Sequence, residues 1–158
     1  MNDVDILKKI EKKVLWLACW MIHNANHIRE NQDGLKVGGH QASSASIVSI
    51  MTALYFNILR PEDRVAVKPH ASPVFHAIQY LSGLQTKEKI ENFRGFGGAQ
   101  SYPSRTKDID DVDISTGSVG LGVAMTSFIS LIQDYVARKN FYKNKPLGRM
   151  IALVGDAE

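Results

Sequence analysis

Two of the five histidines, His40 and His70, stand at junctions between loops and regular elements. His40 follows Gly38 and Gly39, and His70 follows Pro69. Neither lies within an apolar stripe, and imidazoles at such junctions are well placed to contact ligands and to transfer protons near neutral pH. The alternative for each is a surface or helix-capping histidine. These two residues are the first candidates for proton-transfer chemistry.

A glycine-rich turn from Gly117 to Gly122 precedes a long segment with helical apolar spacing. Glycines let a backbone approach a ligand closely, and free N–H groups at the start of a helix attract phosphate. The spacing matches neither the dinucleotide fingerprint, which needs a further glycine, nor the P-loop, which needs a Lys-Ser or Lys-Thr pair. The turn therefore predicts either a phosphate contact or tight packing of a helix on a sheet.

Asp156 follows Gly155 directly after the apolar run Met150–Val154. A carboxylate at the carboxyl end of a strand can hold Mg²⁺, which prefers oxygen ligands and often binds together with a phosphate group. Ligands of open parallel sheets also bind beyond this end of the strands. Because aspartate is common in turns, the alternative is a residue that only begins a turn. We interpret Asp156 as a candidate metal ligand.

Other polar residues are more simply explained by structural roles. His76 is interpreted as a packing residue, because apolar side chains flank it in a helical pattern. His23 and His27 share a helix face but lack a third ligand, so zinc is not predicted. The acidic run at 108–113 lacks the glycine and final glutamate of a calcium loop and predicts a solvated loop. Cys19, between two tryptophans, predicts a buried thiol.

The elements that must position these residues follow from apolar spacing and capping signals. A repeat every three or four residues predicts helices over residues 4–30, about 43–58 and 120–138. Ser72 followed by Pro73 predicts the N-cap of a helix over residues 73–82, and Thr86 predicts the cap of a short helix. The glycines from Gly95 onward begin a loop that reaches about residue 114, a length that usually indicates function or disorder.

Two segments predict strands. Residues 64–68 alternate polar and apolar side chains, whereas Met150–Val154 is continuously apolar, as expected for an interior strand covered on both faces. Strands that alternate with helices predict an α/β fold with a parallel sheet flanked by helices. Because the chain stops just after its most buried strand, we expect it to be a fragment of a longer protein.

The composition is that of a globular protein. Among 158 residues, 44% are hydrophobic and 22% are charged, which excludes disorder along the whole chain. No apolar run approaches the roughly 20 residues of a membrane span. The single cysteine and the lack of a signal peptide predict a cytoplasmic location. The net charge of +3 arises without aromatic residues interleaved among the basic ones, so nucleic acid is not an expected partner.

The order of the motifs is more specific than any one of them. The chain reads Gly-Gly-His-Gln-Ala-Ser from Gly38, His-Ala-Ser-Pro from His70, Ser-Thr-Gly-Ser-Val-Gly-Leu-Gly from Ser115 and Val-Gly-Asp-Ala-Glu from Val154. This order, from residue 38 to 158, resembles the transketolase-like thiamine diphosphate enzymes. With Asn-Phe-Arg at 92–94 and Ser-Tyr-Pro at 101–103, it is most similar to the homodimeric decarboxylating first component of pyruvate dehydrogenase complexes.

The resemblance implies a thiamine diphosphate-binding fold and decarboxylation of a 2-oxoacid, with pyruvate expected. It implies thiamine diphosphate and Mg²⁺ as cofactors, a homodimer, and acyl transfer to the lipoyl carrier of an acyltransferase component. Asp156 would be the Mg²⁺ ligand, and His40 and His70 would be catalytic. The cofactor-binding residues that it implies are His40, Ser43, His70, Gly117, Ser118, Val119, Gly120, Gly155, Asp156 and Ala157.

The resemblance also implies a division of the chain and leaves alternatives. Residues 1–37 would form an amino-terminal helix with its connecting loop, and residues 38–158 the first part of the diphosphate-binding domain, truncated at the metal motif. The family's downstream asparagine and its second domain with the activating glutamate are absent from the 158 residues, so we expect this chain alone to be inactive.

Several positions depart from the family pattern. Ala157 replaces a glycine, Lys68 and Pro69 precede His70 where relatives often have glycine, and Ser104 stands where transketolases have a Gly-His-Pro segment. The last difference argues against a sugar phosphate as the substrate. The alternatives are nevertheless a transketolase that transfers two-carbon units between sugar phosphates, and a non-catalytic regulatory domain that keeps the fold.

Overall fold

The computed structural model describes residues 3–30, 34–141 and 146–155. Its helices are α1 (Asp3–His23), α2 (Gln41–Ala45), α3 (Val48–Ala53), α4 (Ser72–Leu81), α5 (Lys87–Glu91) and α6 (Leu121–Arg138). Its strands are β1 (Arg64–Ala66) and β2 (Met150–Ala152). Short π-helical turns extend α1 and α3, over Asn24–Ile28 and Leu54–Ile58, and a 3₁₀ turn over Pro69–Ala71 leads into α4.

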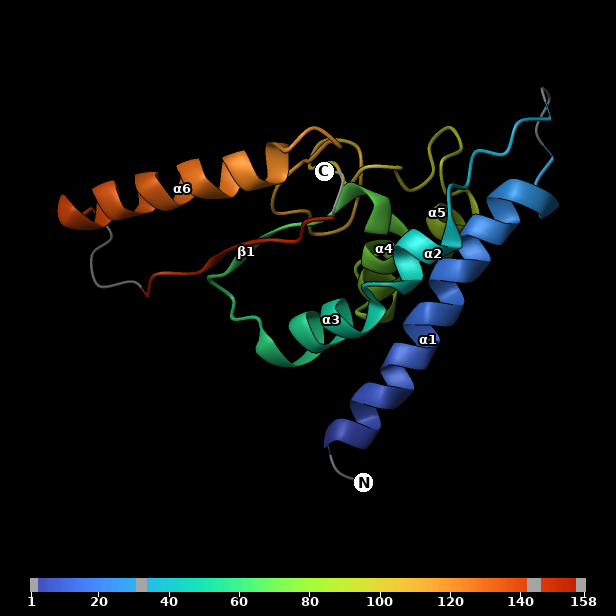
Figure 1. Cartoon of the computed structure of the whole chain (residues 1–158), viewed down its shortest axis with the longest axis horizontal. Coiled ribbons are helices and arrows are strands. Elements are labelled where there is room, and N and C mark those ends of the chain that lie inside the picture. The colour runs from blue at the N-terminus through green and yellow to red at the C-terminus, as the bar shows by residue number, and fades with distance from the viewer. Residues whose placement is uncertain (1–2, 31–33, 142–145, 156–158) are drawn as a thin grey trace.

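The hydrophobic core lies where α4 packs between α1 and α3. The α4 face supplies Val74, Phe75 and Ile78, each at most 1% exposed, and α1 contributes Val14 and Met21, both fully buried. Figure 1 shows α1 and α6 at opposite ends of the molecule, with α4 between them. The core therefore supports the start of α4, where the 3₁₀ turn carries His70.

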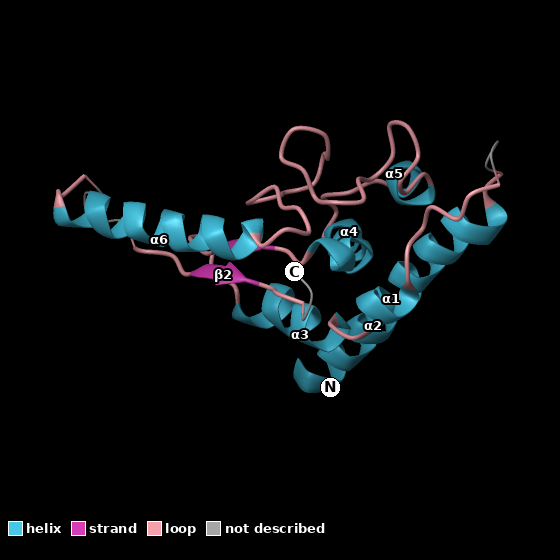
Figure 2. Ribbon diagram, turned by 45° about the horizontal axis from the view of Figure 1, so that its top comes forward, coloured by secondary structure: helices cyan, strands magenta, loops and turns pink. Residues whose placement is uncertain are grey.

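The two strands pair in parallel, with Arg64 opposite Met150 and Ala66 opposite Ala152. Helix α6 lies along this pair (Figure 2), so the arrangement is the predicted α/β type, with parallel strands flanked by helices. The prediction that Met150–Val154 is an interior strand is wrong in this chain. In the described part of the chain β2 has β1 as its only neighbour, its residues are partly exposed, and Val154 is 48% exposed.

The helix boundaries test the capping signals. Thr86 caps α5 as predicted, because its Oγ1 accepts a hydrogen bond from the Lys89 N–H at 3.3 Å. The prediction for Ser72 is wrong: Ser72 is already inside α4, and its buried hydroxyl has no hydrogen-bond partner. The predicted second helix is divided between α2 and α3, since Ile47 leaves the helical conformation. Among the described helices, none has the length and apolar character needed to cross a bilayer.

Candidate functional site

The loop that presents His40 is clamped to the end of α1 by Asn26. Its side-chain oxygen accepts a hydrogen bond from the Gly38 N–H at 2.6 Å, and its amide nitrogen donates to the Gly39 carbonyl at 3.1 Å. A Cβ atom on Gly38 would lie 2.5 Å from the Ile22 carbonyl oxygen, closer than such atoms pack. Gly39 has φ = 82°, a conformation that favours glycine. The two glycines are thus required to bring His40 against α1.

His40, Ser43 and His70 line one cavity of about 240 Å³, which we call the histidine cavity. His40 ends the loop before α2, Ser43 lies within α2, and His70 lies in the 3₁₀ turn before α4. The full lining is Ile22, Gly38, Gly39, His40, Ser43, His70, Pro73, Arg94 and Tyr102. The fold therefore brings together three of the predicted site residues from separate segments of the chain.

The two histidines of this cavity differ from packing histidines in their exposure. Both are exposed, whereas the neighbouring Pro73 is buried at the start of α4. The ring of His70 meets the ring of Tyr102 edge to face, with centroids 6.3 Å apart. Both imidazoles are therefore accessible to a ligand that enters the cavity.

The glycine turn lies at the carboxyl ends of the strands. Gly117 and Gly120 line a narrow space of about 10 Å³ together with Val67, Pro69 and Leu153, which is room for about a single water molecule. Gly120 has φ = 74° and is the N-cap of α6. Because Pro69 borders this space and His70 borders the histidine cavity, the two sites adjoin along the chain.

The remaining predicted site residues that the structure describes do not line the histidine cavity or the narrow space at the glycine turn. Ser118 and Val119 belong to the same turn but do not line the narrow space, and Val119 is 76% exposed. Gly155 follows β2 and is partly buried. Asp156 and Ala157 lie outside the described residues, so the predicted Mg²⁺ ligand and its neighbour stay predictions.

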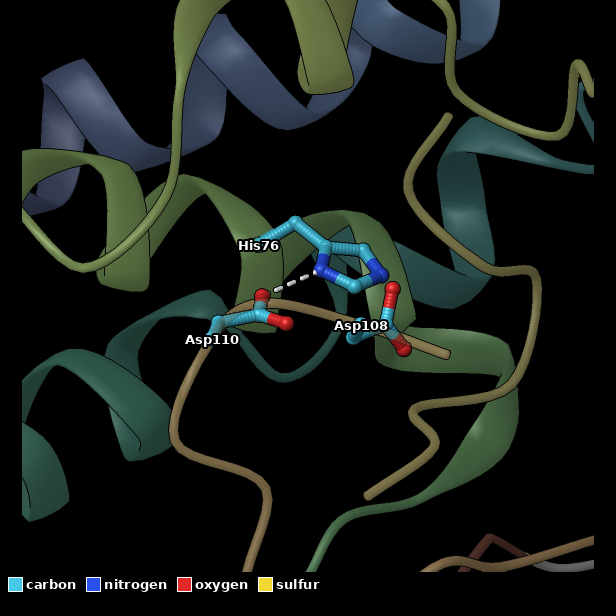
Figure 3. A group of neighbouring side chains, drawn as sticks. All are labelled: His76, Asp108 and Asp110. Atoms are coloured by element: carbon cyan, nitrogen blue, oxygen red, sulfur yellow. Dashed lines mark hydrogen bonds and ion pairs between the residues drawn. The ribbon is translucent and has the colours of Figure 1, made fainter. Parts of the chain in front are cut away.

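A second polar cluster, of His76, Asp108 and Asp110, lies in the interior (Figure 3). The Nδ1 atom of His76 is 2.7 Å from Oδ2 of Asp110, and its Nε2 atom is 2.8 Å from the Gln100 carbonyl oxygen. The side chains of His76 and Asp110 are both fully buried. The rings of Phe75 and Phe93 flank the imidazole. His76 therefore packs as predicted but also carries a buried polar network.

The protonation state of His76 follows from its two acceptors. A neutral imidazole has one N–H, so only the imidazolium donates to Asp110 and Gln100 together. Burial alone lowers the pKa of His76, but the hydrogen bond and the charge of Asp110 outweigh burial and raise it. Although these three side chains could group around an ion, both ring nitrogens already face hydrogen-bond acceptors. We assign the cluster as a structural clamp rather than a metal centre.

The acidic run at 108–113 is not the predicted solvated loop. Asp108 accepts hydrogen bonds from the N–H groups of Gln100 and Ser104, at 2.9 and 2.8 Å, and Asp113 accepts one from Val65 at 2.9 Å. Burial raises the pKa of both carboxyl groups. These carboxylates fix a segment without regular structure that leads from Tyr102 to the glycine turn, a role that composition alone does not indicate.

Two features of the site, and one residue outside it, were not predicted from the sequence. Arg94 and Tyr102 line the histidine cavity, although their segments were noted only as part of the family pattern. Asn26 clamps the glycine loop across twelve residues of sequence, and no local signal identifies such a contact. Cys19 is partly exposed rather than buried, and desolvation raises the pKa of its thiol.

Comparison with known proteins gives consistent names. No protein-family model matches the chain. The pyruvate dehydrogenase E1 component of Mycobacterium tuberculosis is 30% identical over 152 residues, covering 89% of this chain and 15% of that protein. The component of Mycolicibacterium smegmatis is 26% identical over 168 residues, and that of Pseudomonas aeruginosa is 29% identical over 168 residues. Each of these two matches covers 99% of this chain.

The chain is much shorter than these relatives, spanning from 15% to 18% of their length. The similarity nevertheless extends over nearly the whole chain and includes the segments that form the histidine cavity. It agrees with the resemblance drawn from the order of the motifs. By sequence, the chain is therefore similar over nearly its whole length to one part of the pyruvate dehydrogenase E1 components.

Proposed function

We propose that this chain contributes one wall of the active site of a thiamine diphosphate- and Mg²⁺-dependent enzyme that decarboxylates a 2-oxoacid, with pyruvate as the expected substrate. In the complete enzyme the acyl unit would pass to the lipoyl carrier of an acyltransferase component. The observation that carries this proposal is the histidine cavity, where His40, Ser43 and His70 meet from three separate segments. The similarity to pyruvate dehydrogenase E1 components supports the reaction class.

The lining of the histidine cavity fits a diphosphate group. Its polar side chains are two imidazoles, the Ser43 hydroxyl, the Arg94 guanidinium and the Tyr102 phenol, all able to donate hydrogen bonds, and none is a carboxylate. Its volume of about 240 Å³ lies below the roughly 300–1,000 Å³ typical of complete ligand sites. We infer that the cavity holds part of the cofactor and that further walls come from a second protomer or from other parts of the enzyme.

Each residue has a proposed task in this site. Thiamine diphosphate, when bound, supplies the electron sink that makes loss of carbon dioxide from a 2-oxoacid feasible. His40 and His70 would exchange protons with the reacting oxygen, and Ser43 would orient the bound group by hydrogen bonding. The glycine turn would offer backbone N–H groups to the phosphates. Asp156 would bind Mg²⁺ through its carboxylate.

The relatives described above are all pyruvate dehydrogenase E1 components, which favours a 2-oxoacid over a sugar phosphate. The division into residues 1–37 and 38–158, a homodimeric assembly and a cytoplasmic location belong to the same proposal. A regulatory domain without turnover would keep the cavity but bind no cofactor, so cofactor binding separates the two readings.

Calorimetric titration of the chain with thiamine diphosphate, with and without Mg²⁺, tests the proposal. We expect weak binding that Mg²⁺ strengthens, and we expect Asp156→Ala to remove the effect of Mg²⁺ because the metal loses a charged ligand. In a full-length enzyme, His70→Ala should lower turnover while leaving cofactor affinity nearly unchanged. A wild-type affinity that Mg²⁺ does not alter, together with an unchanged Asp156→Ala variant, would contradict the assignment of the metal motif.

The chain of 158 residues is expected to show no pyruvate turnover by itself, because it spans less than a fifth of its relatives and offers only one wall of the site. The measurement is carbon dioxide release with thiamine diphosphate and Mg²⁺ present. Release above that of the cofactor in buffer would show that one wall is sufficient.

A further inference from the structure

Arg94 is the one arginine in the lining of the histidine cavity. It follows α5 and lies against the glycine loop that carries His40. A Cβ atom built on Gly39 would be 3.2 Å from Nη1 of Arg94 and 3.3 Å from Nη2, so the guanidinium lies flat against that glycine. The close packing that excludes a side chain at position 39 therefore holds the cation in the lining of the cavity that both histidines share.

The guanidinium of Arg94 has unused hydrogen-bonding capacity. A guanidinium has five N–H donors. Its Nη1 donates to the Val37 carbonyl at 2.8 Å, whereas its buried Nε has no hydrogen-bond partner. Its Cζ lies 5.3 Å from the centroid of the Phe93 ring. Among the residues that the structure describes, no carboxylate pairs with this partly buried cation.

The backbone at Arg94 adds an independent observation. Its φ of 61° lies in the left-handed region, which arginine adopts at a conformational cost that glycine would avoid. The conformation is held by a hydrogen bond from the Arg94 N–H to the Ala99 carbonyl at 2.9 Å. Strained residues of this kind cluster at sites that bind ligands. The chain thus keeps a large cationic side chain at a position where the backbone favours none.

We propose that Arg94 is an oxyanion-binding residue of the histidine cavity, whose guanidinium takes a carboxylate or phosphate oxygen of the bound ligand. The planar fork of an arginine matches either group. The inference rests on the proposed function for the identity of the two sources, which are the carboxylate of the 2-oxoacid and the diphosphate of the cofactor. The other polar side chains of the lining are neutral or weakly basic donors, so Arg94 supplies the permanent positive charge.

Separate calorimetric titrations of the full chain with inorganic pyrophosphate and with pyruvate test this role. In Arg94→Gln we expect the affinity for the anion that Arg94 binds to fall about 10- to 100-fold, the loss typical of a charge-assisted hydrogen bond. Arg94→Lys should keep the charge but lose the fork, with a smaller loss. Arg105→Gln is the matched control, because it removes the same charge from an exposed arginine outside the cavity and should leave both affinities unchanged.

The two anions identify the source: loss of pyrophosphate binding assigns Arg94 to the cofactor, and loss of pyruvate binding assigns it to the substrate. Equal affinities of wild type and Arg94→Gln for both anions overturn the proposal, as does a wild-type chain that binds neither. If Arg94→Gln does not fold by circular dichroism, Arg94→Lys decides, and unchanged affinities there also overturn it. A wild-type chain that binds pyrophosphate through Arg94 but not thiamine diphosphate would contradict the proposed function alone.

Discussion

The raised pKa of His76 favours its protonated form in the interior, where an unpaired charge is costly. Among the described residues, Asp110 is its one anionic partner at hydrogen-bond distance, and both side chains are fully buried. We expect Asp110→Asn to lower the free energy of unfolding by about 3 kcal/mol, near the lower end for breaking a buried ion pair, because the amide oxygen still accepts a hydrogen bond. Urea unfolding measures this loss. The exposed neighbour Asp111 provides the control, and Asp111→Asn should change little.

The same pair predicts a pH dependence. The pKa of His76 is raised in the folded chain, so above the unfolded value of about 6.5 the folded state binds a proton that the unfolded state has released. The resulting stabilisation is complete below that value and is lost as the pH rises through the folded pKa. Urea unfolding between pH 5 and 9 should show this decline. If Asp110→Asn retained the full decline, a different group would be responsible.

For single residues, the sequence indicated where a side chain lies better than which residue it contacts. The glycines before His40 and the proline before His70 mark junctions, and both histidines do border a cavity. The pattern around His76 correctly predicted burial, but its acceptor lies 34 residues away, on a segment with no periodicity. The spacing of apolar residues indicates which face of a helix a residue lies on. A hydrogen bond to a distant segment depends instead on the conformation of the loop that carries the partner.

At the level of the elements, Asp63 joins the beginnings of the two strands. Its carboxylate, 1% exposed, accepts hydrogen bonds from the N–H of Arg149 at 2.7 Å and from that residue's guanidinium, with Nη2 at 2.5 Å. The hydrogen bond from the Arg149 side chain is the main reason that the pKa of Asp63 lies well below its usual range. The contact fixes the register that places Arg64 opposite Met150.

This contact predicts a loss of stability in acid. Because the pKa of Asp63 is lowered by folding, its stabilisation is present above the unfolded value of about 3.9 and is lost as the pH falls towards the folded pKa. Thermal unfolding between pH 5 and 2.5 should show a steeper fall for wild type than for Asp63→Asn. Glu91→Gln, which removes an exposed ion pair with Lys87, is the control and should leave the acid profile nearly unchanged.

Most helices and strands could be predicted from the sequence, and the predictions that were wrong have physical causes. Helical spacing found α1 and α6, the Ser72-Pro73 pair located α4 although Ser72 is not its cap, and Thr86 capped α5, because these signals are local. The apolar run of β2 predicted parallel pairing correctly but an interior position wrongly. A continuously apolar strand is expected to be covered on both faces. The pattern does not indicate whether the covering segments belong to these 158 residues.

Over the whole molecule, α6 presents an apolar surface with nothing on it in the described part of the chain. Phe128, Leu131, Ile132 and Tyr135 are 62, 65, 60 and 59% exposed, although the helix packs on both strands. Contiguous patches of this kind rarely stay uncovered in a soluble monomer. We predict concentration-dependent self-association in sedimentation experiments, and we expect Phe128→Ser with Leu131→Ser to reduce it.

A matched control for this surface is Phe96, which is fully exposed but lies on the loop after α5. Phe96→Ser removes a similar apolar side chain away from α6 and should leave the association unchanged. A double variant in α6 that sediments like wild type would show that another surface is responsible. Circular dichroism should confirm that both variants keep the helical content of wild type.

The pairing of β1 with β2 also constrains how the chain reaches its fold. The hydrogen bond between Arg149 and Asp63 spans 86 positions, and the strands meet only after three helices and a long irregular segment have been placed between them. During synthesis, β1 leaves the ribosome long before β2 is made. The backbone groups at its edge therefore stay unpaired during that time. Contacts of such long range slow folding and extend the time in which apolar surface is open to aggregation. A chaperone that binds nascent chains would therefore have most time to bind this chain before β2 emerges from the ribosome.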